Sequence, residues 1–269
     1  MSICIAGKGY IAVQALGYLQ EISRIKLYAM PLANDTGADT WMPSLKRFAD
    51  KIGVECLSFD DCQCTKPSTL ISLEYDKIFR LHKWPDTKIF NIHFSKLPAY
   101  KGMATSSWPI FNGETEVGVT LHEVDHGIDT GPIIAQDTFL LDDHETAETL
   151  YYKFHQNGFK LFRKNITSLI NGDYTATLQP SIGSSYYSNG EFEFSKDLNM
   201  NKTAAQISNE FRSKFFPVFQ FPKWRGMEFS QLEILRVRST VKAGNILTEN
   251  SQFITVSTID YDIKLFLRN

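Results

Sequence analysis

The sequence predicts an α/β fold with a doubly wound, mostly parallel sheet and a smaller C-terminal β-rich subdomain. Strand-like and helix-like segments alternate through the first half of the chain, which is typical of a parallel sheet. Beyond residue 173 the composition shifts to Ser, Tyr, Asn and Gly, and β-like runs follow. A chain of 269 residues has room for one large domain and an appended part, and we expect domains at residues 1–180 and 181–269.

The first elements are predicted by apolar runs and their spacing. Residues 2–6 are a short apolar run that ends in Gly7-Lys8-Gly9, and Ile11, Leu16 and Leu19 then recur near helical spacing. This pattern predicts a strand, a tight turn and a helix. By the same reasoning we expect strands at 25–29 and 88–94 and a helix at 44–52.

After residue 116 the pattern changes to two β-rich runs, at 117–124 and 132–139. The residues between them are turn formers. A long helix is predicted at 144–171, with apolar side chains on one face and Gly172 as its stop. A further helix is expected at 203–215, and further strands at 253–259 and 263–266.

Composition excludes several classes of protein. Hydrophobic residues make up 43% of the chain and aromatic residues 13%, which excludes a disordered protein. The net charge is -2, so the chain has no overall positive field to attract nucleic acid or an anionic membrane. The N-terminus does not resemble a signal peptide, and no apolar stretch is long enough to cross a bilayer. We expect a cytoplasmic protein with small-molecule partners and without nucleic acid or membrane.

The four cysteines do not predict a disulfide scaffold or a metal site. Cys62 and Cys64 form a C-x-C pair with Cys56 nearby, but a zinc site would need a fourth ligand. The acidic residues around this pair indicate a solvated loop. We expect reduced thiols and no metal.

Residues 122–126, His-Glu-Val-Asp-His, match the zinc-protease pattern H-E-x-x-H literally. That motif requires a helix that places both histidines on one face. Here β-branched residues precede it and Gly127 follows it, so the segment is predicted to be a strand and a turn. A metalloprotease is not expected.

Two polar residues on one predicted strand indicate a site. Asn91 and His93 are two apart, so both side chains point to one face of the strand, and Ile92 points to the other. Open α/β sheets bind their ligands at the carboxyl ends of the strands, where this pair lies. The alternative is a structural histidine at the sheet edge that bonds to a backbone carbonyl.

Three segments together resemble one family. Residues 91–102, which include Asn-Ile-His and Leu-Pro, residues 112–122, and Gly-Ile-Asp-Thr-Gly at 127–131 are similar, in order and spacing, to blocks of the 10-formyltetrahydrofolate-dependent formyltransferases. The resemblance implies transfer of a formyl group from 10-formyltetrahydrofolate, as co-substrate, to an amine, without a metal.

The resemblance also implies roles for residues. His93 would be the base, Asn91 the donor to the developing oxyanion, and Asp129 the partner of His93 that favours its protonated form. Protonated His93 then delivers a proton to the departing folate nitrogen. In this family backbone groups hold the pterin, and the matching segments are 78–82 and 124–127. We take Phe79, Leu81 and Asp125 as folate contacts.

The second half of the chain indicates which amine receives the formyl group. Residues 186–219 resemble the segment after the catalytic domain of sugar-nucleotide N-formyltransferases. This implies a dTDP-linked amino-dideoxy sugar as substrate, for bacterial O-antigen or surface polysaccharide synthesis, and a homodimer. The first expectation is dTDP-4-amino-4,6-dideoxyglucose and the second a 3-amino-3,6-dideoxyhexose. Residues with the chemistry to bind a diphosphate or a base are Lys8, Tyr187, Arg212, Phe219, Phe221 and Lys223.

Two alternatives stay open. The β-rich C-terminal stretch looks like a shortened form of the barrel of methionyl-tRNA formyltransferases, which would make a charged tRNA the substrate. The second alternative is a module that binds a sugar nucleotide or a folate and catalyses no reaction. The aromatic residues of the C-terminal part are also explained, in place of nucleotide binding, as the packed core of the subdomain.

Overall fold

The computed structural model describes residues 1–268, and these form two compact units. Unit 1 consists of residues 1–102, 118–139 and 152–186, and unit 2 of the described residues 103–117, 140–151 and 187–268. The predicted boundary near residue 180 is close to the passage from one unit to the other after Tyr186. Two segments within residues 1–180 nevertheless belong to unit 2, and the division into domains at residue 180 stays a prediction.

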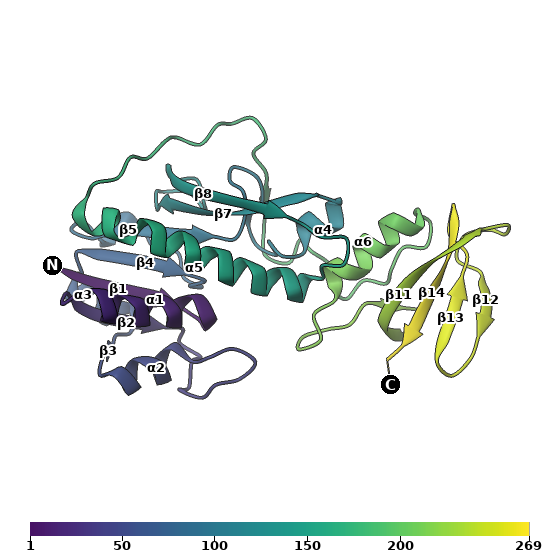
Figure 1. Ribbon diagram of the computed structural model, residues 1–269, viewed down its shortest axis with the longest axis horizontal. Coiled ribbons are helices and arrows are strands. Elements are labelled where there is room, and N and C mark those ends of the chain that lie inside the picture. Colours follow the sequence, from purple (N-terminus) through teal and green to yellow (C-terminus); the bar gives the residue numbers. More distant parts are fainter. Residues whose placement is uncertain (269) are drawn as a thin grey trace. The chain divides into compact units, whose positions relative to one another are not determined.

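A seven-stranded sheet forms the centre of unit 1 (Figure 1). Its order is β3-β2-β1-β4-β5-β7-β8. The pairs from β3 to β5 are parallel, whereas β5 and β7 are antiparallel. The strands are β1 (Ser2–Gly7), β2 (Lys26–Pro31), β3 (Glu55–Cys56), β4 (Thr69–Leu73), β5 (Lys88–His93), β7 (Glu116–Glu123) and β8 (Ile133–Leu140).

The chain leaves β1 in one direction along the sheet and returns at β4 on the other side, as a doubly wound fold requires. The backbones of β1 and β4 approach each other closely at Gly7 and Leu73. A side chain at Gly7 would place its Cβ 1.9 Å from the carbonyl oxygen of Leu73, so only glycine fits there. The turn that follows leads into α1 (Gly9–Ile22), which buries Ile11, Leu16 and Leu19 as the spacing predicts.

Three further helices are α2 (Leu45–Ile52), α3 (Phe59–Thr65) and the long α5 (Ala147–Asn171), and η1 (Leu81–Lys83) is a short 3-10 turn. Ser44 caps α2 by accepting a hydrogen bond from the amide of Arg47. The solvated loop predicted around Cys62 is wrong: this segment is α3. Cys62 is fully buried, with its Sγ 3.6 Å from that of Cys4, because one face of α3 packs on the sheet.

Unit 2 combines helices with a five-stranded antiparallel sheet of order β10-β11-β14-β13-β12. The strands are β10 (Lys223–Trp224), β11 (Met227–Arg238), β12 (Ile246–Glu249), β13 (Phe253–Val256) and β14 (Tyr261–Leu267). The helices are α4 (Trp108–Asn112) and α6 (Ala204–Lys214), the latter with a Thr203–Gln206 capping box. Ile207 and Phe211 of α6 join Phe229 and Ile263 of the sheet in one core.

The predicted fold class is confirmed: a mostly parallel sheet precedes a smaller β-rich part. Two short strands, β6 (Lys101–Gly102) and β9 (Tyr186–Tyr187), form a separate ladder. Within residues 1–268, no helix combines the length and the apolar character that crossing a bilayer requires.

Candidate active site

The register of β5 and β7 brings polar side chains together on one face of the sheet. Asn91 lies opposite His122, and His93 opposite Thr120, in an antiparallel pair. Residues that face each other across a ladder point to the same side. The pair that the sequence places on one strand face therefore meets a second histidine, which comes from the neighbouring strand.

Asp129 reaches the same cluster from the loop between β7 and β8. Its Oδ2 accepts a hydrogen bond of 2.9 Å from the amide of Gly102 and lies 3.5 Å from Nδ1 of His93. Asp129 has a φ of 55°, in the left-handed region that few residues other than glycine adopt. Gly131 is required beside it, because a Cβ there would lie 1.8 Å from the carbonyl oxygen of Glu123.

His93 is held at both ring nitrogens. Nε2 lies 2.8 Å from the carbonyl oxygen of Tyr100, and a carbonyl only accepts, so Nε2 carries a proton and donates it. Nδ1 faces the carboxylate of Asp129. The ring is 8% exposed, so these two contacts fix its orientation away from bulk water.

Asn91 and His122 complete the cluster. His122 Nδ1 donates to the carbonyl of Glu123 at 2.7 Å, which leaves Nε2 of the neutral ring as an acceptor. The side-chain nitrogen of Asn91 lies 3.2 Å from this Nε2 and 3.3 Å from Oδ1 of Asp129. Both amide hydrogens of Asn91 are thus directed at partners within the cluster.

The Asp129 carboxylate is stabilised in its charged form. Burial alone would raise the pKa of Asp129, but the charge of a protonated His93, the nearby His122 ring and the hydrogen bond from the Gly102 amide together lower it well below its ordinary value. Asp129 is therefore an anion at every physiological pH. An anion in a buried site with two imidazoles and an amide is suited to proton transfer.

The predicted folate contacts lie on two segments of unit 1. Phe79 is buried against the rings of Phe59, Tyr75 and Trp84, so only its backbone is available to a ligand. Leu81 begins η1 and packs partly on the same core.

Asp125 holds its own loop together, accepting hydrogen bonds from the Gly127 amide and the Thr130 hydroxyl. Its carboxylate therefore shapes the loop that leads to Asp129. Contact with a folate stays a prediction for Asp125, Phe79 and Leu81.

Lys8 lies at the N-terminus of α1, and its Nζ is 3.9 Å from a carboxylate oxygen of Glu74. Next to it His155 accepts a hydrogen bond from the amide of Ile11 at its Nδ1. Burial and then the charge of Lys8 lower the pKa of His155 to about 3, so this histidine is neutral. His155 caps the helix and is unlike His93, which faces a carboxylate.

The five predicted sugar-nucleotide residues of unit 2 have separate partners. Arg212 donates to the carbonyl of Glu145 and the side chain of Asn209, and Tyr187 stacks on Trp108 with ring centroids 4.2 Å apart. The remaining pairs are Lys223 with Glu228, Phe221 with Arg268 and Phe219 with Phe216. None of these contacts joins one of the five to another, and their binding roles stay predictions.

Sequence reasoning missed His122, the Tyr100 carbonyl and the Gly102 amide as members of the cluster. The H-E-x-x-H match contains His122, and the prediction that this segment is a strand is correct. The sequence does not show that His122 faces Asn91, because that depends on the register of β5 and β7. The backbone groups leave no side-chain signature. Among residues 1–268, no three His, Cys, Asp or Glu side chains are grouped so that they could hold a metal ion.

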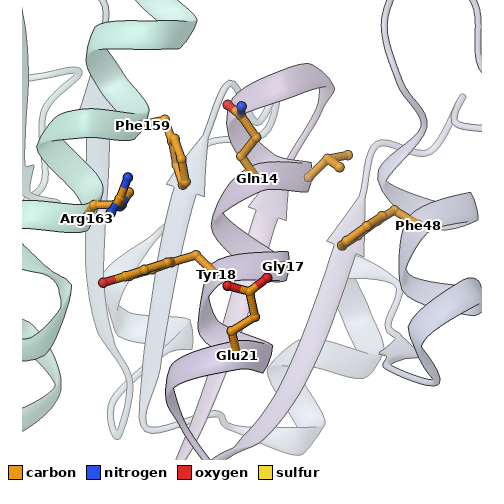
Figure 2. A pocket seen from close by; sticks show the side chains of 8 residues that line it. Gln14, Gly17, Tyr18, Glu21, Phe48, Phe159 and Arg163 are labelled. Carbon is orange, nitrogen blue, oxygen red and sulfur yellow. The ribbon is translucent and has the colours of Figure 1, made fainter.

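A pocket of about 430 Å³ lies elsewhere in unit 1, between α1, α2 and α5 (Figure 2). Tyr18, Phe48 and Phe159 form its walls, and the guanidinium of Arg163 lies 5.2 Å from the centre of the Tyr18 ring. None of its lining residues is a predicted site residue.

Comparison with known proteins identifies the family. Residues 70–166, which include β5, β7 and Asp129, match the family model described as formyl transferase. A methionyl-tRNA formyltransferase of Thermodesulfovibrio yellowstonii is 30% identical over 69% of this chain and 62% of its own length. One of Endomicrobium trichonymphae is 30% identical over 66% of this chain and 51% of its own length, so the chain spans only about half to three-fifths of these relatives.

Two solved structures are similar over almost the whole chain. WlaRD, a sugar 3N-formyl transferase crystallised in the presence of dTDP and 5-N-formyl-THF, is 34% identical with a TM-score of 0.89, over 100% of this chain and 98% of its own. The N-formyltransferase of Helicobacter canadensis, in complex with folinic acid and dTDP-3-aminofucose, is 34% identical with a TM-score of 0.90, over 99% of each chain. On this full-length similarity, and as the sequence predicts, the chain belongs to the formyl transferase family.

Proposed function

We propose that this protein is a sugar-nucleotide N-formyltransferase, which transfers a formyl group from 10-formyltetrahydrofolate to the amine of a dTDP-linked amino-dideoxy sugar. The observation that carries the proposal is the buried cluster of Asn91, His93, His122 and Asp129 at the carboxyl end of β5. It supplies an anion, two imidazoles and an amide at the edge where α/β sheets bind ligands.

The amine attacks the formyl carbon, and a tetrahedral adduct with an oxyanion forms. His93 takes up the proton of the attacking nitrogen and returns one to the departing folate nitrogen. In the structure its Nε2 is engaged by Tyr100, so the lone pair for this proton is at Nδ1, which faces Asp129 at 3.5 Å. Asp129 stabilises the imidazolium that results.

Asn91 donates to the oxyanion in this mechanism. Its two amide hydrogens face His122 and Asp129 at 3.2 and 3.3 Å, which are long hydrogen bonds. An oxyanion competes well for one of these hydrogens, because a hydrogen bond to a charged acceptor is shorter and stronger than one to a neutral ring nitrogen.

The position of the amino group on the sugar is the finer question. The two relatives that are 34% identical over their full lengths are a sugar 3N-formyl transferase and an enzyme solved with dTDP-3-aminofucose. This supports the 3-amino-3,6-dideoxyhexose, the second expectation from the sequence, ahead of dTDP-4-amino-4,6-dideoxyglucose. Both sugars belong in the test.

The test is incubation of the protein with 10-formyltetrahydrofolate and a panel of dTDP-linked 3-amino and 4-amino sugars. We expect tetrahydrofolate to be released and the sugar to gain one formyl group, as followed by mass spectrometry. UDP-linked sugars serve as the control for the nucleotide. Absence of release across the whole panel would overturn the proposal. A thermal-shift screen of the same nucleotides identifies the one that binds, since a ligand of the folded state raises the melting temperature.

A second candidate function is formylation of methionyl-tRNA, which the curated relatives carry in their names. Binding of tRNA requires a basic surface and depends strongly on salt. The chain has 28 lysines and arginines against 30 acidic residues, which disfavours this candidate. Tight, salt-sensitive binding of charged initiator tRNA would favour it over the sugar nucleotide.

Three further parts of the proposal have their own tests. A homodimer is measured by light scattering, a cytoplasmic location by cell fractionation, and a role in surface polysaccharide synthesis by disruption of the gene. A binding module without turnover is the outcome if ligands bind and no formyl group moves.

A further inference from the structure

The segment after α5 contacts the loop that carries Asp129 and the beginning of β8. Residues 172–185 contain no helix, and Figure 1 shows them as an extended stretch that passes β7 and β8. Thr177 and Ile133 of β8 exchange backbone hydrogen bonds of 2.8 Å in both directions, and the Tyr174 hydroxyl donates to the carboxylate of Glu123 at 2.7 Å. We name residues 174–185 the strap.

Gln179 of the strap binds the loop that carries Asp129. Its Nε2 donates to the carbonyl oxygen of Asp129 and to that of Gly131, each at 2.8 Å. The first bond fixes the peptide plane directly after Asp129, and the second fixes the plane two residues further on. Asp129 is a non-glycine residue with a φ of 55°, a conformation that persists only where the surroundings impose it.

The orientation of the Gln179 amide follows from these acceptors. Two carbonyl oxygens face Nε2, so the amino end of the side chain must point at the loop. Oε1 is buried and has no hydrogen-bond partner among residues 1–268, so the side chain is held through its amino end. A carboxylate at this position would face two carbonyl oxygens and be repelled by them.

The strap supports the other side of the cluster as well. Ser185 Oγ accepts a hydrogen bond of 2.8 Å from the amide of Tyr100, and Ser184 Oγ accepts one of 2.8 Å from Nζ of Lys101. Tyr100 supplies the carbonyl that holds His93. The strap thus contacts the backbone on both sides of the His93–Asp129 pair.

From this geometry we infer that Gln179 is a positioning residue for formyl transfer: it holds the Asp129 loop so that the carboxylate faces His93 and Asn91. Gln179 touches neither of those side chains, so it acts through Asp129. A displacement of about 1 Å at such a site lowers a rate by as much as ~100-fold. This inference rests on the proposed function for its kinetic part only.

The experiment compares Gln179→Ala and Gln179→Glu with Leu178→Ala. Leu178 is the neighbouring strap residue, and its side chain is 80% exposed, so Leu178→Ala changes the strap while the Gln179 hydrogen bonds stay in place. We expect kcat to fall about tenfold or more in both Gln179 variants while the KM for the folate donor changes by less than about twofold. Leu178→Ala should match the wild type.

A second measurement separates positioning from folding and needs no substrate. The imidazole NMR signals of His93, assigned with His93→Gln, should shift in both Gln179 variants and stay in place in Leu178→Ala. If Gln179→Ala unfolds, Gln179→Glu, which has the same shape, gives the answer. Unchanged His93 signals and unchanged kcat in a folded Gln179 variant would overturn the inference. If the wild type itself turns over no substrate, the proposed function fails, and the NMR comparison still decides the role of Gln179.

Discussion

Two buried charge clusters of this protein, one in each unit, differ in what their partners can do. In unit 1 the carboxylate of Asp129, 12% exposed, faces His93 and His122. In unit 2 the carboxylate of Glu210, 5% exposed, lies 2.9 Å from Nζ of Lys202 and 3.0 Å from Nζ of Lys214. In both, burial raises the carboxyl pKa, and the partners of the carboxylate more than offset that rise.

The partners set the two clusters apart. Lysines stay charged through the neutral range, and Lys214 in addition donates to the carbonyl of Lys196 at 2.7 Å, which ties α6 to the chain before it. Histidines exchange protons near neutral pH. Asp129 also stands on a strained loop, whereas Glu210 and Lys214 lie one turn apart on a regular helix. A buried carboxylate alone therefore does not indicate proton transfer; partners that exchange protons near neutral pH do.

The largest expected effect separates chemistry from stability. We expect His93→Ala to lower the rate of formyl transfer by about 100-fold or more, because the proton carrier is lost, in a protein that stays folded at the assay temperature. The measurement is initial rates with the identified sugar nucleotide, beside thermal unfolding. His144→Ala, at an exposed histidine, is the control. A rate unchanged by His93→Ala would show that the mechanism is wrong even with the right substrate.

The reverse pattern is expected in unit 2. Glu210→Ala leaves the buried ammonium of Lys214 without its carboxylate, and breaking such a buried pair costs about 3–5 kcal/mol of unfolding free energy. Chemical denaturation measures this loss, and Glu193→Ala, in an exposed pair with Lys196, should leave stability in place. A Glu210→Ala protein as stable as the wild type would contradict the structural role.

A smaller effect appears in the pH dependence of stability. The pKa of Asp129 is lower in the folded than in the unfolded protein, so its contribution is complete above the unfolded value near ~4 and is lost as the pH falls further. Asp129→Asn should therefore be less stable than the wild type by more than ~1 kcal/mol at neutral pH, and the two curves should converge in acid. Thermal unfolding between neutral and acid pH measures this.

The control for this comparison is Asp173→Asn, at an exposed position, which should leave the whole curve unchanged. A gap between wild type and Asp129→Asn that widens in acid would mean that the carboxylate is not stabilised in the folded state.

The sequence predicted most elements of the first sheet well. Each strand or helix must bury one of its faces, and the spacing of its own apolar residues records which face that is. The strand with Asn91 and His93, the long helix before Gly172 and the turn around Asp129 were all predicted close to their observed bounds. It did not predict β4, whose five residues are all buried, nor α3, where the apolar positions are few and acidic residues surround Cys62.

What the sequence by itself determined is that Asn91 and His93 share a strand face and that Asp129 follows on a glycine-flanked loop, since both depend only on residue spacing and backbone preference. Only the tertiary structure decided which groups meet there. His122 faces Asn91 through the register of two strands. The Tyr100 carbonyl and the Gly102 amide come from the chain just before β6 and from β6 itself, and Gln179 comes from a segment about 50 residues beyond Asp129. Contacts between segments so far apart depend on how the sheet is assembled, which no local pattern in the chain records.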